Sequence, residues 1–234
     1  MLGQDTNLAL NKTAIATSGT ASFAVDGNVG TRWESASSDP QTWQVDLGSD
    51  QTVRSFVIVW QTAYTENYTI TVAAEGAAVD GAGFITDGTE VASGTNAAGK
   101  AELWTQVINL DADQTVRYVK FTGTSRATIW GHSFWEFGVY GSEQAEVLSN
   151  LTLTAAKTSA SVGDNVALTV TGKNQYGGVI TEMPTLTYTS SVPAVGTVSD
   201  GVFHAAGAGT TTITVKNSDE TVQATVDITV LAGS

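Results

Sequence analysis

The chain of 234 residues has no cysteine, which excludes disulfide bonds, thiolate metal sites and cysteine nucleophiles. It has only 10 lysine and arginine residues against 23 aspartate and glutamate residues, a net charge of −13. Binding to nucleic acid phosphates or to an anionic membrane surface requires clustered positive charge. Long apolar runs are also missing, since the longest, at 56–60, is far shorter than the roughly 20 residues of a membrane-spanning helix. These shortages predict a protein that binds no nucleic acid and does not insert into a membrane.

Threonine is abundant, with 36 copies. Its branched Cβ favours extended backbone over helix. Hydrophobic residues make up 41 %, enough for real hydrophobic cores, so the chain is not of the disordered class. The composition therefore predicts a folded protein rich in β-structure.

Apolar and polar residues alternate with the period of two that is typical of half-buried strands. The alternation is clear at 43–47, 56–60, 68–72, 104–108, 116–121 and 134–140, and again at 166–170, 213–215 and 222–230. Residues 73–100, rich in glycine, alanine and aspartate, predict loops with a weak strand. No long segment has the period of a helix. With turn signals at intervals of roughly ten residues, the pattern predicts an all-β fold of two antiparallel sandwiches.

The aromatic residues divide the chain into two unlike parts. After Gly141 the only aromatic residues are Tyr176, Tyr188 and Phe203. A polar stretch, 142–146, lies where the composition changes. We therefore predict one domain at 1–144 and a second at 145–234. All six tryptophans precede the boundary: Trp33, Trp43, Trp60, Trp104, Trp130 and Trp135.

A series of ordered motifs covers residues 7–141 of the first domain. They are NLALNK at 7–12, AVDGN at 24–28, TRW at 31–33, VDLG at 45–48, VIVWQTAY at 57–64, RYVKF at 117–121, RAT at 126–128 and GHSFWEFGVYG at 131–141. In this order they resemble the discoidin family, also called the coagulation factor 5/8 C-type domain, and most of all its bacterial carbohydrate-binding modules of family 32. The resemblance implies a jelly-roll-like β-sandwich with a structural calcium ion and a ligand site on loops at one end.

Ca²⁺ prefers six to eight oxygen ligands. The segment 26–31 offers a carboxylate, an amide and a hydroxyl, and its two glycines allow a tight loop around an ion. The resemblance implies carboxylates from Asp26 and Glu136, a hydroxyl and carbonyl from Thr31, and further backbone carbonyls. Without an ion, the same residues could form a turn capped by Asp26, with Glu136 paired to Arg32 or to another cation. The further carbonyl ligands that the resemblance implies are those of Phe23, Asn28 and Trp135.

Carbohydrate sites combine an aromatic platform with hydrogen-bonding side chains. Three segments match the loops that form the ligand site in similar modules, namely 32–35, 61–64 and 126–132. Arg126 could instead form a structural ion pair, and His132 could stabilise a loop. Trp33, Trp43 and Trp60 are expected in the core because they lie in or beside strands. The candidate ligand-binding residues are Arg32, Glu34, Gln61, Tyr64, Arg126, Trp130 and His132.

Departures from the family pattern bear on the ligand. In chitosan-binding relatives the position after the strand-end tryptophan tends to be acidic, but here it is the neutral Gln61. Trp130 and His132 stand where relatives commonly have tyrosine. We therefore expect a neutral β-glucan, with chitosan or a galactose-type glycan as the alternatives.

The second domain resembles bacterial immunoglobulin-like repeats through its strand-and-turn segments at 168–177, 196–203 and 206–215. Such motifs identify a fold and not a ligand. We expect a spacer rather than an adhesive domain, because few aromatic or charged residues remain to form a binding hot spot.

An enzyme would need a positioned catalytic group. Glycoside hydrolysis requires paired carboxyls, and nothing in the spacing pairs Glu34, Glu66 or Glu102. A serine–histidine arrangement would have to use His132 or His204, the only two histidines. The sequence therefore predicts no catalysis.

The predicted function is non-catalytic carbohydrate binding. The domain would anchor a larger exported bacterial protein, with further modules, to a polysaccharide outside the cell or at the bacterial cell surface. Residues 1–5 show no basic segment of a secretory signal, so this location follows from the resemblance. The alternative function is that of a protein-binding surface adhesin. Such an adhesin would need a broader exposed patch than a sugar site.

Overall fold

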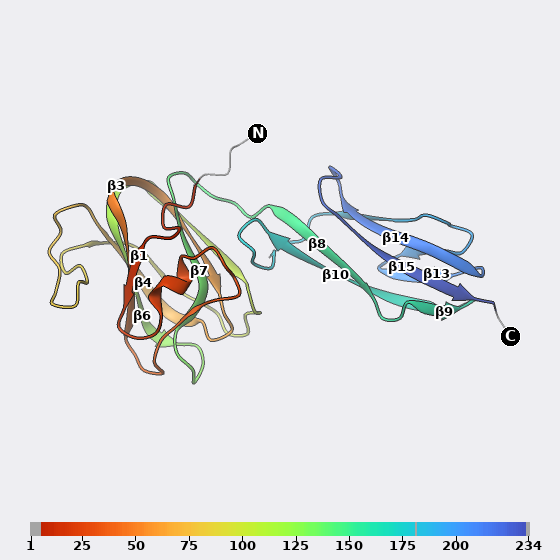
Figure 1. Ribbon diagram of the computed structural model, residues 1–234, viewed down its shortest axis with the longest axis horizontal. Helices are drawn as coiled ribbons and strands as arrows, with labels where there is room; N and C mark the ends of the chain where they lie inside the picture. The colour runs from red at the N-terminus through yellow and green to blue at the C-terminus, as the bar shows by residue number, and fades with distance from the viewer. Residues whose placement is uncertain (1–5, 181, 233–234) are drawn as a thin grey trace. The chain divides into compact units, whose positions relative to one another are not determined.

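The computed structural model describes residues 6–180 and 182–232. Its chain divides into two compact units. The first comprises Met1–Glu146 with Tyr176–Gly178, and the second comprises Val147–Gln175 with Val179–Ser234. Apart from one short 3-10 helix, the regular structure of the described residues is all strand (Figure 1), which confirms the all-β prediction. No helix in the described part of the chain is long and apolar enough to cross a membrane.

The first unit is built around two long antiparallel strands, β3 and β6. The first part of β3 pairs with β1 and with the second part of β6, while its last residues pair with β7 and with the first part of β6. Both long strands thus take part in both layers of a sandwich. The strand order is β2-β7-β3-β6-β4-β5, with β1 added on β3. The elements are β1 (Thr13–Ala16), the 3-10 helix η1 (Ala21–Ala24), β2 (Trp33–Glu34), β3 (Gln41–Trp60), β4 (Thr65–Ala73), β5 (Thr89–Thr95), β6 (Thr105–Arg126) and β7 (Ser133–Tyr140).

Aromatic side chains fill the core of this sandwich. Trp33, Trp43 and Trp60 are completely buried, as the sequence predicts. The rings of Trp33 and Phe134 lie 4.8 Å apart between centroids, and those of Trp60 and Phe121 lie 5.9 Å apart. Large buried rings dominate core energetics, so this cluster provides a rigid base for the loops at the strand ends.

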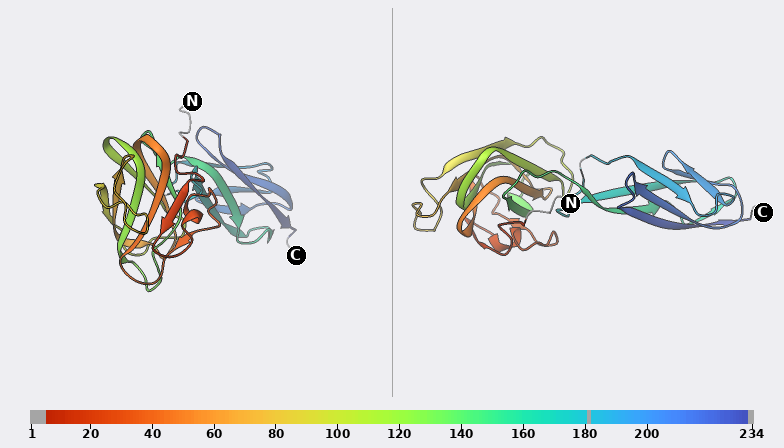
Figure 2. Two further views of the ribbon diagram at one scale, coloured as in Figure 1. Left: turned by 60° about the vertical axis from the view of Figure 1, so that its left-hand side comes forward. Right: turned by 90° about the horizontal axis from the view of Figure 1, so that it is seen from above.

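The second unit consists of two four-stranded sheets, which face each other in the views of Figure 2. One has the order β12-β13-β10-β8 and the other β11-β14-β15-β9. Alternating residues such as Val166, Ile213 and Ile228 point inward and are buried in a separate core. The strands are β8 (Leu148–Ala155), β9 (Ser159–Ser161), β10 (Asn165–Asn174), β11 (Leu186–Ser190), β12 (Gly196–Ser199), β13 (Val202–Ala205), β14 (Gly209–Asn217) and β15 (Gln223–Leu231).

Candidate functional site

The loops that follow β2 and β6 are joined at one end of the first unit. The backbone N–H of Ser35 donates to the carbonyl oxygen of His132 at 2.9 Å, and the N–H of His132 donates back to Oγ of Ser35 at the same distance. Between them, Gly131 lies so close to Ser35 that a Cβ would collide with its carbonyl oxygen. The two loops therefore form one connected surface.

His132 lies beneath this surface, and its side chain is completely buried. One ring nitrogen, Nδ1, is 2.9 Å from Oγ1 of Thr65, and the other, Nε2, is 2.8 Å from Oδ1 of Asp39. Burial lowers the pKa of His132, and the neighbouring Asp39 carboxylate only partly opposes this effect. In this structure His132 has the loop-stabilising role that the sequence leaves open as an alternative to ligand contact.

Arg126, the last residue of β6, holds the tip of the same loop. Its Nε is 3.2 Å from both carboxylate oxygens of Asp39. Its Nη1 donates to the carbonyl oxygens of Ile129 at 3.2 Å and Trp130 at 3.4 Å. Arg126 is thus committed to an ion pair and to the backbone of the loop that it supports.

Trp130 and Ile129 are the exposed apolar residues of this loop, with 61 % and 80 % of their surface accessible. The N–H of Trp130 donates to Oγ1 of Thr128 at 3.2 Å, which helps to fix the turn. An exposed indole on a loop held by an ion pair and a buried histidine has the geometry of an aromatic platform. The exposure of Trp130 agrees with the prediction from the sequence.

The segment 61–64 contributes less to the surface than the sequence suggests. Tyr64 is only 4 % exposed, donates its hydroxyl to the carbonyl oxygen of Ala97 at 2.9 Å and packs edge-on against Trp104. The amide of Gln61 accepts the N–H of Ala63 at 2.6 Å and donates to Oγ1 of Thr62 at 2.7 Å. Tyr64 therefore belongs to the core, and the Gln61 side chain shapes its own turn.

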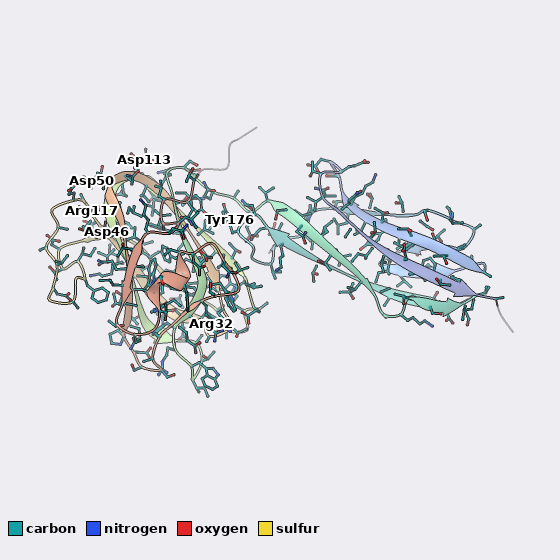
Figure 3. The ribbon with its side chains drawn as sticks, viewed as in Figure 1. Arg32, Asp46, Asp50, Asp113, Arg117 and Tyr176 are labelled. Atoms are coloured by element: carbon teal, nitrogen blue, oxygen red, sulfur yellow. The ribbon has the colours of Figure 1, made fainter. Side chains whose placement is uncertain are left out.

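Arg32 and Glu34 form an ion pair. Arg32, labelled in Figure 3, immediately precedes β2, and Glu34 is the last residue of β2. The guanidinium of Arg32 also lies 5.4 Å from the ring centroid of Trp135. The indole N–H of Trp135 donates to Oε1 of Glu102 at 2.7 Å, and Oε2 of Glu102 is 3.4 Å from Nε2 of Gln61. This series of contacts connects three of the predicted ligand-binding residues, Arg32, Glu34 and Gln61, through Trp135 and Glu102.

Four residues outside the predicted ligand-binding set complete the site, of which Ser35 lies in a predicted loop segment: Ser35, Asp39, Thr65 and Glu102. Each lies far along the chain from its partner; Asp39, for example, is separated from His132 by 93 positions. The sequence carries no short motif for such contacts, because they exist only after β2, β4, β6 and β7 have assembled.

Four of the six residues predicted for calcium, namely Asp26, Asn28, Thr31 and Glu136, lie within hydrogen-bond contact of one another. The N–H of Asn28 donates to Oδ1 of Asp26 and to Oε1 of Glu136, each at 2.9 Å, and Oγ1 of Thr31 donates to Oδ2 of Asp26 at 2.7 Å. Glu136 is 8 % exposed. Burial and the neighbouring Asp26 carboxylate raise the pKa of Glu136 to about 8.

The backbone near this carboxylate pair is also suited to metal binding. Trp135 occupies a bulge in the pairing of β7 with β3, because Glu136 pairs with Val59 and Phe134 pairs with Trp60. A bulged residue is left out of the regular pairing of the two strands, which is the position that the prediction gives to the Trp135 carbonyl. Both alternatives from the sequence have partial support, since the Asp26 turn is present whereas Arg32 pairs with Glu34 and not with Glu136.

The first unit is a β-sandwich domain whose candidate site lies on loops at one end. The profile of the F5/8 type C family, in the group described as NedA-like, galactose-binding domain, matches residues 23–121. Through its first unit, the chain belongs to the F5/8 type C (discoidin) family, as its motifs predict. No curated protein matches the sequence.

Solved structures similar to this unit include two modules of a chitosanase/glucanase from Paenibacillus sp. IK-5. A point mutant of its chitosan-binding module 1 is 41 % identical, with a TM-score of 0.52, and the match covers 59 % of this chain and all of that one. Its chitosan-binding module 2, solved in complex with chitotriose, is 35 % identical with a TM-score of 0.51, and the match covers 58 % of this chain and all of that one.

Proposed function

We propose that the first unit is a non-catalytic carbohydrate-binding module whose ligand packs on Trp130. The observation that carries this proposal is the 61 % exposed indole at a loop tip that Arg126 and His132 hold in place. Sugars present apolar CH faces that pack on such rings and hydroxyls that hydrogen-bond to neighbouring polar groups. The similarity to chitosan-binding modules supports the same class of ligand.

For the ligand we propose a β-linked glucan chain. The carboxylates of Glu34 and Asp39 pair with Arg32 and Arg126, and Gln61 is neutral, which supports a sugar without charge. The Glu102 carboxylate beside Gln61 keeps a cationic sugar as a candidate. Chitosan is the second candidate, because the similar Paenibacillus modules bind it by description. A comparison of cellotriose with chitotriose at the same pH separates the two.

Trp130→Ala tests the platform. We expect at least a tenfold loss of affinity for the bound trisaccharide, about 1.4 kcal/mol, measured by isothermal titration calorimetry. Trp130→Phe should retain part of the affinity because an aromatic face remains. The control is Val192→Ala, which removes an exposed apolar side chain of the second unit. Equal affinities of the wild type and the Trp130→Ala variant would refute the proposed site.

We further propose that Asp26, Glu136 and Thr31, with the backbone carbonyls of Phe23, Asn28 and Trp135, hold a structural Ca²⁺ ion. The donor set supports this assignment, since two adjacent carboxylates, a hydroxyl and a bulged strand carbonyl are oxygen ligands of the kind that Ca²⁺ prefers. The ion would connect the loop after η1 to β7 and supply no chemistry to the ligand.

For the whole chain we propose an anchoring role at the bacterial surface or outside the cell, with the second unit as an immunoglobulin-like spacer. The similar modules derive from a chitosanase/glucanase, in which polysaccharide binding accompanies catalysis. Holding a protein on an abundant polymer raises its effective local concentration. A protein-binding adhesin is the alternative, and binding of the chain to cells that lack the glycan would favour it.

A further inference from the structure

A recess of about 270 Å³ lies on the outer face of the first unit, away from the loop-end site. Neighbouring residues of β1, β3 and β6 form its floor. Thr13 of β1, Asp46 of β3 and Tyr118 of β6 are neighbours in one row across the sheet. Ile15 and Gln44 are neighbours two residues further along their strands, on the same face. The residues that line it are Thr13, Ile15, Gln44, Asp46, Val79, Ala82, Gly83 and Tyr118.

The loop between β4 and β5 closes one side of the recess and is firmly attached to the sheet. The side chain of Gln44 donates to the carbonyl oxygen of Gly83 at 3.0 Å and accepts the N–H of Ile85 at 2.8 Å. Nζ of Lys120 donates to the carbonyl oxygen of Ile85 at 2.6 Å. The wall that carries Val79, Ala82 and Gly83 is therefore part of the folded domain.

The polar wall centres on the Asp46 carboxylate. Arg117 donates to its two oxygens at 3.0 and 3.1 Å, and the N–H of Gly48 donates at 2.8 Å. Partial burial raises the pKa of Asp46, but the hydrogen bonds from Arg117 and Gly48 outweigh burial and lower it overall. Figure 3 labels Asp46 and Arg117 together on the side of the unit away from Arg32. The ionised carboxylate of Asp46 is thus held in the lining of the recess.

The other walls are aromatic and apolar. Tyr118 is half-buried, and the guanidinium of Arg117 lies 5.1 Å from its ring centroid, which fixes the ring. Ile15 is half-buried and Val79 is 50 % exposed. A tyrosine ring and aliphatic side chains beside a carboxylate and a threonine hydroxyl offer the two kinds of contact that a pyranose ring makes, through its apolar CH groups and its donating hydroxyls.

We propose that this recess is a second carbohydrate site, which takes a single sugar unit or the end of a glycan chain. The ligand class rests on the function proposed for the loop-end site, but the recess shares no residue with that site. Tyr118 and Arg126 are eight positions apart on β6, about 26 Å at roughly 3.3 Å per residue. Two separated sites on one domain would strengthen binding to a polymer beyond either site alone.

The test is an NMR titration of the ¹⁵N-labelled chain with chitotriose and with cellotriose. It compares the wild type, Trp130→Ala, Tyr118→Ala and the double variant. Thr124→Ala serves as the control, since it removes an exposed side chain of the same strand β6 that lines no part of the recess.

We expect the amide signals of Val79, Gly83 and Tyr118 to shift on titration in the Trp130→Ala variant and in the control. Tyr118→Ala should weaken this binding at least tenfold and leave the shifts at Ile129 and Trp130 in place. The amide spectrum of each variant in the absence of sugar verifies its fold.

Three outcomes would overturn the second site: no shift at the recess with either trisaccharide, recess shifts that vanish in Trp130→Ala, or recess binding unchanged in Tyr118→Ala. Failure of the loop-end proposal has a different signature. In that case the signals of Ile129 and Trp130 stay unmoved in every variant, whether or not the recess responds.

Discussion

Trp130 and His132 lie two positions apart in one loop, yet the first is 61 % exposed and the second is completely buried. The difference follows from their partners. His132 finds Thr65 and Asp39 for its two ring nitrogens, whereas the Trp130 indole extends from a tip that Arg126 holds by its backbone. The buried polar residue supports the loop, and the exposed aromatic residue is the one that we propose to contact the ligand.

Stability should depend on the protonation of His132. Its pKa in the folded state is lowered by burial, while the unfolded value is about 6.5. The unfolded chain therefore binds more protons between these two values, so the free energy of unfolding falls as the pH drops below about 6.5. Above that pH the contribution of His132 is fully present.

Urea unfolding of the wild type and His132→Gln between pH 7.5 and pH 5 measures this effect. We expect the wild type to lose more stability over this range than the variant, which has no imidazole to protonate. Parallel pH profiles for the two proteins would contradict the assignment.

Gly123 of β6 makes room for the buried imidazole. A Cβ at this position would collide with the His132 ring. We expect Gly123→Ala to cost about 1–3 kcal/mol, the range typical of overpacking, and to weaken sugar binding by displacing the loop. Gly81→Ala is the matched control because a Cβ there meets nothing within 4 Å. Thermal unfolding and calorimetric titration of both variants provide the comparison, and equal stability would show that the ring can move aside at no cost.

At the level of elements, β3 attaches the β4–β5 loop to the sheet through a single side chain. Gln44 satisfies the backbone of this loop at Gly83 and Ile85. Gln44→Ala would leave the buried N–H of Ile85 without this acceptor, a loss of about 1–3 kcal/mol. Hydrogen exchange of the Ile85 amide should accelerate accordingly. Gln51→Ala, which removes a side chain bonded only to Ser49, should leave that exchange rate as it is.

The sequence predicts the elements well and the site in part, and the reason is physical. Alternation has a period of two, so it locates segments of β3, β4, β6 and β7 and places Trp43 in the core. At 56–60 every side chain is buried, so this end of β3 is covered on both faces and is not half-buried as the pattern predicts. Burial at strand ends follows no such period. Whether Tyr64 faces the solvent depends on Ala97, which lies 33 positions away, and no local pattern encodes that contact.

At the scale of the whole molecule, the two units have separate hydrophobic cores, one rich in aromatic rings and the other built mainly from aliphatic side chains. Separate cores in one chain favour separate cooperative unfolding transitions. All the proposed calcium ligands, from Phe23 to Glu136, belong to the first unit. The second unit therefore provides an internal control for any effect of the metal.

Chelation should act on one transition only. A ligand that binds the folded state alone stabilises it in proportion to the logarithm of its concentration over the dissociation constant, about 2.7 kcal/mol at a hundredfold excess. In differential scanning calorimetry, we expect EDTA to lower the midpoint temperature of the first unit's transition and to leave that of the second unit unchanged. Added CaCl₂ should restore the midpoint of the first unit. Glu136→Gln should give the chelated value in both conditions, because one of the two carboxylates is gone. If neither midpoint moves, the Asp26–Glu136 pair holds no ion. If both midpoints move, the metal acts outside the proposed ligand set.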